Sequence, residues 1–216
     1  MNNNACTQSN LDVVEKDETK AFECYKEAAE KGHDMAQNVL GYLYMNDEHT
    51  EKDLERAIYW FKKSAENGNE EAQYNLGKCY KLGIGVEKDE IKAFEYYKKS
   101  AEKEDADAQF QLGECYRLGI GIEKDETKAF EYYEKSAGKE HNMSQCALGY
   151  LYENGEGTEK DLEKAIYWYQ KALENDNVVA LHSLGNHYRN GIGVKKDQTK
   201  AFEYYKEVAE KGYNMA

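Results

Sequence analysis

The sequence contains no proline among its 216 residues. Because proline is the residue that most strongly interrupts a helix, its absence, together with abundant Ala, Glu, Lys and Leu, favours an all-α chain. Long apolar runs are also missing, and none approaches the roughly 18 to 20 residues that a helix needs to cross a bilayer. The N-terminus, MNNNACTQSN, has neither the basic start nor the apolar core of a signal peptide. We therefore expect a cytoplasmic protein with no membrane insertion, or one in the endoplasmic reticulum lumen if the full-length chain has a signal peptide.

Cysteines are few, and basic residues are outnumbered. The five cysteines, at positions 6, 24, 79, 115 and 146, form no C-x-x-C pair, so neither a disulfide framework nor a zinc knuckle is expected. A reducing compartment fits this pattern best. The 42 acidic and 29 basic residues give a formal charge of −13, which repels nucleic-acid phosphate and anionic lipid, and no local basic patch opposes it. We expect no nucleic-acid partner.

Patterns of catalytic and metal-binding residues are also missing. The five histidines include no pair spaced four residues apart, the spacing that holds a metal on a helix, and no G-x-S-x-G sequence is present. Acidic residues are so dense that pairs of carboxylates arise by chance. We therefore expect no enzymatic activity, no catalytic residue, no cofactor and no metal.

An aromatic pentapeptide is present instead, and it returns every 36 residues, six times. It begins at residues 21, 57, 93, 129, 165 and 201 and reads AFECY, AIYWF, AFEYY, AFEYY, AIYWY and AFEYY. A fixed period of this length is typical of a solenoid, in which units that cannot bury their own apolar face stack on one another. Function must then be sought on the surface of the stack.

The pentapeptide lies in a predicted helix, which we call the B helix of each unit. In the unit at residues 88–103, Ala93, Tyr97 and Ala101 form an apolar stripe of helical spacing. An aspartate stands at the N-cap position, where its carboxylate can accept hydrogen bonds from the first free amides. Because this acid recurs in every unit, a structural role is expected for Asp17, Asp53, Asp89, Asp125, Asp161 and Asp197.

A second motif, A-Q-x-x-L-G-x-x-Y, predicts a second helix, the A helix. It occurs at residues 36–44, 72–80 and 108–116, with variants at 144–152 and 180–188. A glycine inside a helix costs about 1 kcal/mol relative to alanine. The chain bears this cost five times, so we expect the B helix to approach too closely for a Cβ at Gly41, Gly77, Gly113, Gly149 and Gly185.

Glycines in the loop between the A and B helices, such as LGIGVEKD at residues 82–89, supply the left-handed conformations that end the A helix. A phosphate-binding loop is not favoured, because the third glycine of that motif is missing and no strand precedes the loop. In one unit Asp47 and His49 replace both glycines, which predicts a distorted turn.

Together, A-x-x-x-L-G-x-x-Y, G-x-G-V and D-x-x-K-A-x-x-Y-Y at this spacing resemble the Sel-one-like repeat (SLR) family, a branch of the tetratricopeptide-like helical hairpins. The resemblance implies a right-handed α-solenoid of antiparallel helix pairs that serves as a non-catalytic scaffold or adaptor for protein complexes, often in signalling or quality control. An exported branch of the family ties each hairpin with a disulfide. Here Cys79 and Cys115 have no cysteine in the B helix to pair with, so we expect buried thiols.

The resemblance runs over residues 13–216, which we expect to form one solenoid, after an irregular or disordered segment at residues 1–12. An unpaired B helix would begin it, followed by five A/B hairpins, about eleven helices in all, with Ala216 at the first position of a further unit. Ends of this kind expose apolar faces. They suggest a fragment of a longer array or of a multidomain signalling protein, for example one fused to a kinase, or a chain that associates end to end.

If the A helices line a concave face, their variable positions are the candidates for binding a partner protein or peptide. Four cations there, Lys78, Lys81, Arg117 and Arg189, lie near aromatic residues and favour an acidic or C-terminal-carboxylate peptide. The alternative is that neighbouring acids neutralise these cations. Met45 and Cys146 lie at two further variable positions of this face. The predicted partner-binding residues are Asn38, Tyr42, Tyr74, Lys78, Lys81, Phe110, Glu114, Arg117, Tyr150, Glu153, His182, Asn186 and Arg189.

Overall fold

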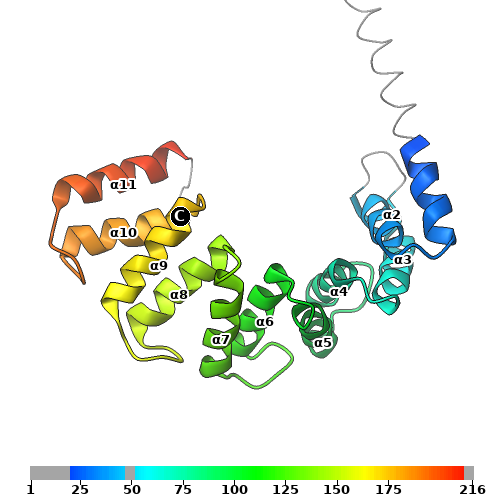
Figure 1. The fold of residues 1–216 in the computed structure, drawn as a ribbon, viewed down its shortest axis with the longest axis horizontal. Helices are drawn as coiled ribbons and strands as arrows, with labels where there is room; N and C mark the ends of the chain where they lie inside the picture. The colour runs from blue at the N-terminus through cyan, green and yellow to red at the C-terminus, as the bar shows by residue number, and fades with distance from the viewer. Residues whose placement is uncertain (1–19, 47–51, 212–216) are drawn as a thin grey trace, which may run out of the picture. The chain divides into compact units, whose positions relative to one another are not determined.

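The computed structural model describes residues 20–46 and 52–211, and these residues form helices and connecting loops without any strand (Figure 1). Residues 20–30 are helical. Together with ten further helices they account for the eleven helices predicted. These ten are α2 (Asp34–Asn46), α3 (Leu54–Glu66), α4 (Glu70–Leu82), α5 (Glu90–Ala101), α6 (Ala106–Leu118), α7 (Glu126–Ala137), α8 (Asn142–Asn154), α9 (Leu162–Glu174), α10 (Val178–Asn190) and α11 (Gln198–Glu210).

The chain divides into two compact units, Met1–Lys103 and Glu104–Ala216. In the first unit α2 packs on α3, α3 on α4 and α4 on α5. In the second unit the pairs α6–α7, α8–α9 and α10–α11 pack in the same way, and α7 contacts α8 as α9 contacts α10. Each unit is therefore a stack of antiparallel A/B helix pairs, the solenoid arrangement predicted from the 36-residue period. None of the helices in the described residues combines the length and the apolar character needed to cross a membrane.

The repeated aspartates begin the B helices, as predicted. Asp89 is extended at φ −146°, and its carboxylate accepts a hydrogen bond from the backbone amide of Lys92. Asp53, Asp125, Asp161 and Asp197 cap α3, α7, α9 and α11 in the same way. Asp17, Asp47 and His49 lie outside the described residues, as do residues 1–12 and Ala216, so the predictions made for them stay predictions.

The glycine inside each A helix makes room for an aromatic ring of the B helix, which confirms the close approach predicted from the sequence. A Cβ added to Gly113 would lie 2.8 Å from the Tyr133 ring, and one added to Gly77 would lie 2.6 Å from the Tyr97 ring. The rings of Phe61, Tyr169 and Tyr205 stand in the same relation to Gly41, Gly149 and Gly185. The chain therefore bears the helix-weakening glycine in order to seat a large buried ring.

The core lies between consecutive helix pairs. One cluster joins the B helix α9 to the A helices on either side of it, and it is formed by Tyr152, Ala165, Ile166, Tyr169, Ala172, Ala180 and Leu184. Cys79 and Cys115 are buried in equivalent A-helix positions, and none of the four cysteines in the described part of the chain forms a disulfide. The prediction of buried thiols without a disulfide at these two positions is confirmed.

Candidate binding groove

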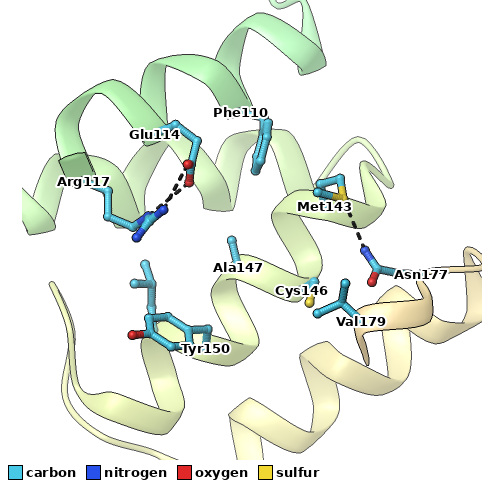
Figure 2. Close-up of a pocket in the computed structure, with 10 residues that line it drawn as sticks. Phe110, Glu114, Arg117, Met143, Cys146, Ala147, Tyr150, Asn177 and Val179 are labelled. Carbon is cyan, nitrogen blue, oxygen red and sulfur yellow. Dashed lines mark hydrogen bonds and ion pairs between the residues drawn. The ribbon is translucent and has the colours of Figure 1, made fainter. Parts of the chain in front are cut away.

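A groove of about 380 Å³ opens on the A helices of the second unit. Its lining side chains come from α6, α8 and the start of α10 (Figure 2). Ala147 lies between Arg117 and Tyr150 on one side and Asn177 and Val179 on the other. We call this feature the A-helix groove, and it is lined by Phe110, Glu114, Arg117, Met143, Cys146, Ala147, Tyr150, Leu151, Asn177 and Val179.

Helical spacing explains why these residues meet. Phe110, Glu114 and Arg117 are separated by one turn each, so they share a face of α6. The opposite face of the same helix carries Leu112 and Cys115, which are fully buried in the core. Residues 143, 146, 147 and 150 form the corresponding face of α8. Because one face of each A helix is buried in the core, the opposite face, which carries the variable residues, is directed toward solvent.

Arg117 does not stand as a free cation in this groove. Its guanidinium forms a two-point ion pair with Glu114, with Nε to Oε1 at 3.1 Å and Nη2 to Oε2 at 3.0 Å. The hydroxyl of Tyr133 donates to the same Glu114 carboxylate and accepts from Arg117 Nε at 3.2 Å. The hydrogen bond to Glu114 raises the pKa of Arg117, and burial, followed by Glu114, raises the pKa of Tyr133. The pair is therefore charged on both partners and neutral in sum.

The same device recurs in the next two repeats. The hydroxyl of Tyr169 donates to Glu153 at 2.8 Å, and burial, followed by that hydrogen bond, raises the pKa of Tyr169. In the last repeat Tyr205 donates to Asn186 at 2.8 Å. In each case the tyrosine ring of the B helix packs against the glycine of the A helix. Its hydroxyl donates a hydrogen bond to a polar side chain on the variable face of that A helix. The sequence analysis missed this link between packing positions and variable positions.

Phe61 shows the complementary case in the first unit. It takes the place of these tyrosines in α3 and has no hydroxyl, and the A-helix residues at the positions of the acceptors are Tyr42 and Met45. In the second unit, an acceptor on the A helix is thus present beside each of the three tyrosine hydroxyls. Part of the variation on the A helices therefore serves packing and does not encode a partner.

The structure brings some of the predicted residues together and separates others. Phe110, Glu114, Arg117 and Tyr150 line the groove, as does Cys146 from the equivalent position. Glu153, His182, Asn186 and Arg189 belong to the same unit but do not line it. The side chain of His182 contacts Asn186, and the guanidinium of Arg189 lies 5.9 Å from the centre of the Tyr205 ring.

The remaining predicted residues lie in the first unit. Tyr42 is 57% exposed and Lys78 is exposed, while Tyr74 and Lys81 are half-buried. The ring of Tyr74 lies 5.8 Å from that of Tyr97. Asn38 is only 4% exposed, and its side-chain oxygen accepts from Asn75 at 3.1 Å. Asn38 therefore joins adjacent A helices and does not present its side chain to a partner. Its prediction as a partner-binding residue is corrected.

Five residues of the groove were not predicted: Met143, Ala147, Leu151, Asn177 and Val179. The predicted set was counted from the L-G-x-x-Y motif and therefore began one turn too late on α8 and α10. A signal was available for two of them. Met143 and Val179 are apolar residues in the first turn of an A helix, at a position where α4 and α6 carry Glu71 and Asp107 and α2 carries Met35.

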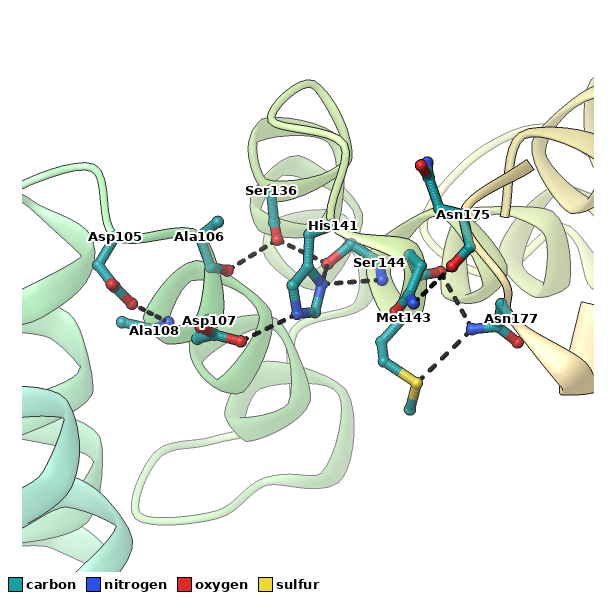
Figure 3. A network of polar contacts seen from close by, with 11 residues as sticks. Asp105, Ala106, Asp107, Ala108, Ser136, His141, Met143, Ser144, Asn175 and Asn177 are labelled. Carbon is teal, nitrogen blue, oxygen red and sulfur yellow. Dashed lines mark hydrogen bonds and ion pairs between the residues drawn. The ribbon is translucent and has the colours of Figure 1, made fainter. Parts of the chain in front are cut away.

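A second polar arrangement in this unit contains the side chains of a hydrolase triad without its chemistry (Figure 3). His141 Nε2 lies 3.1 Å from Asp107 Oδ1, and its Nδ1 lies 2.9 Å from Ser144 Oγ. However, His141 is the N-cap of α8, and its Nδ1 accepts a hydrogen bond from the backbone amide of Ser144. Nε2 therefore carries the hydrogen and donates it to Asp107.

Ser144 is fully buried, and its hydroxyl donates to Ser136 at 2.7 Å. Ser136 in turn donates to the Ala106 carbonyl at 2.7 Å. The arrangement therefore caps a helix and joins two repeats, and it has no accessible nucleophile. No group of His, Cys, Asp and Glu side chains suited to a metal ion occurs within residues 20–46 and 52–211.

Comparison with known proteins agrees with this geometry. The model of the Sel1 repeat family matches residues 9–33, 34–69, 70–105, 106–141, 142–177 and 178–213. Protein c5321, described as a protective antigen in uropathogenic Escherichia coli strains displaying an SLR fold, is 36% identical with a TM-score of 0.85. That match covers 88% of this chain and 41% of the antigen, so the chain spans less than half of its relative.

Two further structures show the same fold. A Sel1 repeat protein from Oxalobacter formigenes is 31% identical with a TM-score of 0.80, over 84% of this chain and 74% of that protein. An immunity protein from Pseudomonas aeruginosa is 20% identical with a TM-score of 0.58, over 88% of this chain and 73% of that protein, which shows a similar fold alone. A search of curated proteins found no match.

Proposed function

Because this chain belongs to the Sel1 repeat family, whose repeats form protein-interaction scaffolds that are generally non-catalytic, we propose that it binds an extended segment of a partner protein in the A-helix groove. The observation that carries the proposal is the exposure of large apolar side chains there. Met143 is 47% exposed and Tyr150 is 45% exposed, on helices whose other faces are fully buried. Apolar surface gathered in a groove is typical of an interaction site.

The size of the groove favours an extended segment over a helix. A helix with its side chains is about 10 to 12 Å wide, whereas a volume of about 380 Å³ accommodates only a few side chains. An extended chain that inserts one or two apolar side chains fits this space. The variation between repeats agrees with a role in recognition, because Phe110, Cys146 and His182 hold one position while the leucine two residues later does not change.

A selection with a peptide library tests the proposal. Randomised peptides displayed on phage would be selected on the full chain and on Ala147→Trp, which places a large ring in the centre of the groove. Gln170→Trp, on the exposed face of α9, is the matched control. We expect the selected peptides to bind Ala147→Trp about tenfold more weakly, which corresponds to about 1.4 kcal/mol. They should bind the control as they bind the wild type.

Circular dichroism on both variants shows whether the tryptophan disturbs the fold. Peptides that bind folded Ala147→Trp as tightly as the wild type would place the binding site elsewhere. A reducing compartment is part of the proposal, because none of the four cysteines in the described residues forms a disulfide.

A second candidate function, self-association, is favoured by one residue of α11. Phe202 is 68% exposed, whereas Ile166, at the equivalent position in α9, is 7% exposed against the next A helix. We propose that a second copy of the chain covers this ring. Light scattering at several concentrations should then show a mass that rises with concentration, and Phe202→Glu should abolish the rise. A constant monomer mass for the wild type would exclude this function.

A further inference from the structure

We propose that the A-helix groove selects an apolar segment with basic flanking residues and rejects acidic ones, because Arg117 is already paired with the carboxylate of Glu114. The inference rests on the proposed function and names the chemistry of the partner. The four cations of the A helices favoured an acidic peptide in the sequence analysis, whereas a partner with basic residues follows from the alternative, that neighbouring acids neutralise these cations.

The first step concerns Glu114, whose two carboxylate oxygens are both engaged. Oε1 accepts from Arg117 Nε and from the Tyr133 hydroxyl, and Oε2 accepts from Arg117 Nη2. The Glu114 side chain is 19% exposed and that of Arg117 is 30% exposed, so water screens the pair only in part. A carboxylate from a partner would therefore have to displace Glu114 or approach within a few ångströms of it.

The second step concerns what remains of the guanidinium. Among the described residues, the Nη1 group of Arg117 has no hydrogen-bond partner, and an arginine has five N–H donors in all. Its charge is balanced by Glu114 while its position is held at two points. An arginine of this kind offers a fixed N–H donor to a neutral acceptor, such as a main-chain carbonyl of an extended segment.

The third step concerns the other charges at this end of the groove. The charge of Glu156 and, to a smaller extent, that of Glu153 raise the pKa of Tyr150. Glu153 also accepts a hydrogen bond from Tyr169 at 2.8 Å. Lys124, the other cation near Arg117, forms a 2.6 Å ion pair with Glu126. Because the Arg117–Glu114 pair is neutral in sum, Glu153 and Glu156 leave the Tyr150 end of the groove with a negative balance of charge.

The remainder of the lining fixes the central residue of the partner. Phe110, Met143, Ala147 and Val179 offer apolar surface. The side chain of Asn177 is already occupied, because its oxygen caps α10 and its nitrogen contacts Met143 Sδ at 3.6 Å. An aliphatic side chain, the size of leucine or methionine, suits this surface. A lysine or arginine next to it would lie among carboxylates on a chain whose formal charge is −13.

The selection described above, carried out with the full chain and a library randomised at seven positions, tests the inference. We expect wild-type selections to be enriched in Leu, Met, Lys and Arg and about tenfold depleted in Asp and Glu relative to the input. Glu114→Gln keeps a hydrogen-bonding side chain but leaves the charge of Arg117 unbalanced, so acidic residues should reappear. Glu156→Gln, further from the guanidinium, should restore them to a smaller extent.

The failure of the inference and the failure of the proposed function give different outcomes. Wild-type selections rich in Asp or Glu, or identical selections on wild type and Glu114→Gln, would overturn the inference alone. Peptides that bind Ala147→Trp as they bind the wild type, or no enrichment over that variant, would overturn the proposed function and the inference with it. Weaker binding of the selected peptides in 0.5 M than in 0.05 M NaCl is the result expected for attraction between basic residues and the groove.

Discussion

Replacement of Gly113 by alanine should destabilise the chain, although alanine is the better helix former. The added Cβ would lie 2.8 Å from two carbons of the Tyr133 ring, whereas carbon atoms in contact are separated by about 3.5 to 4.0 Å. Tyr133 is fully buried, so its ring cannot swing away into solvent. It must move within a packed core and pull its hydroxyl from Glu114 and Arg117.

The magnitude follows from three contributions. Overpacking of a core costs about 1 to 3 kcal/mol, and each weakened hydrogen bond costs about 0.5 to 1.5 kcal/mol. The gain in helix propensity from glycine to alanine is about 1 kcal/mol and acts in the opposite direction. With both hydrogen bonds weakened, the free energy of unfolding should therefore fall by about 1 to 5 kcal/mol, which urea denaturation followed by circular dichroism would show as a lower midpoint.

The same substitution at Gly138 is the control. This glycine ends α7 with φ −62°, a conformation that alanine adopts readily, and a Cβ there would meet only backbone oxygens at 3.4 and 3.5 Å. Gly138→Ala should leave the midpoint unchanged or raise it. A Gly113→Ala protein as stable as the wild type would refute the account of the glycine as the seat of the aromatic ring.

Three further predictions follow from caps, thiols and hydroxyls. Hydrogen bonds from Lys128 lower the pKa of Asp125 from its ordinary value of 3.8, so its contribution to stability is complete above that value and is lost as the pH falls through the lowered one. Asp125→Ala should therefore lower the urea midpoint at pH 7, and the difference from wild type should shrink at pH 2 to 3; a difference that does not depend on pH would contradict the cap. Burial raises the pKa of Cys79 and Cys146 to about 11, so iodoacetamide at pH 8 should alkylate exposed Cys24 before these two thiols, as read by peptide mass spectrometry. Tyr169→Phe should lower the free energy of unfolding by about 1 kcal/mol because Glu153 loses a donor, whereas Tyr167→Phe, at a ring that is 51% exposed, should change it little.

Much of the fold could be predicted from the sequence because its signals are local and repeated. An aspartate before each B helix, a glycine after four of the five A helices and apolar residues at helical spacing act over distances of a few residues. Repetition every 36 residues also separates such signals from chance. The caps at Asp89 and Asp125 and the left-handed Gly83 and Gly119 are the result.

The candidate site was less accessible, because it depends on which side chains from different repeats face one another. Counting from the L-G-x-x-Y motif placed Phe110 and Tyr150 on the groove but missed Met143 and Val179, which lie one turn earlier. It also placed buried Asn38 on the surface. An asparagine at a variable position looks the same in a sequence whether it faces solvent or the neighbouring helix.

By itself, the sequence determined the period, the helix pairs and the place of the glycines, since each follows from propensity and spacing along one chain. Only the tertiary structure decided the state of Arg117. Glu114 lies one turn away on the same helix, so spacing alone makes it a possible neighbour of Arg117. Tyr133 comes from α7, packs beside Gly113 and hydrogen-bonds to both residues. That contact joins α7 to α6 through the space left by the missing side chain of Gly113. It makes Arg117 a fixed donor whose positive charge is balanced by Glu114.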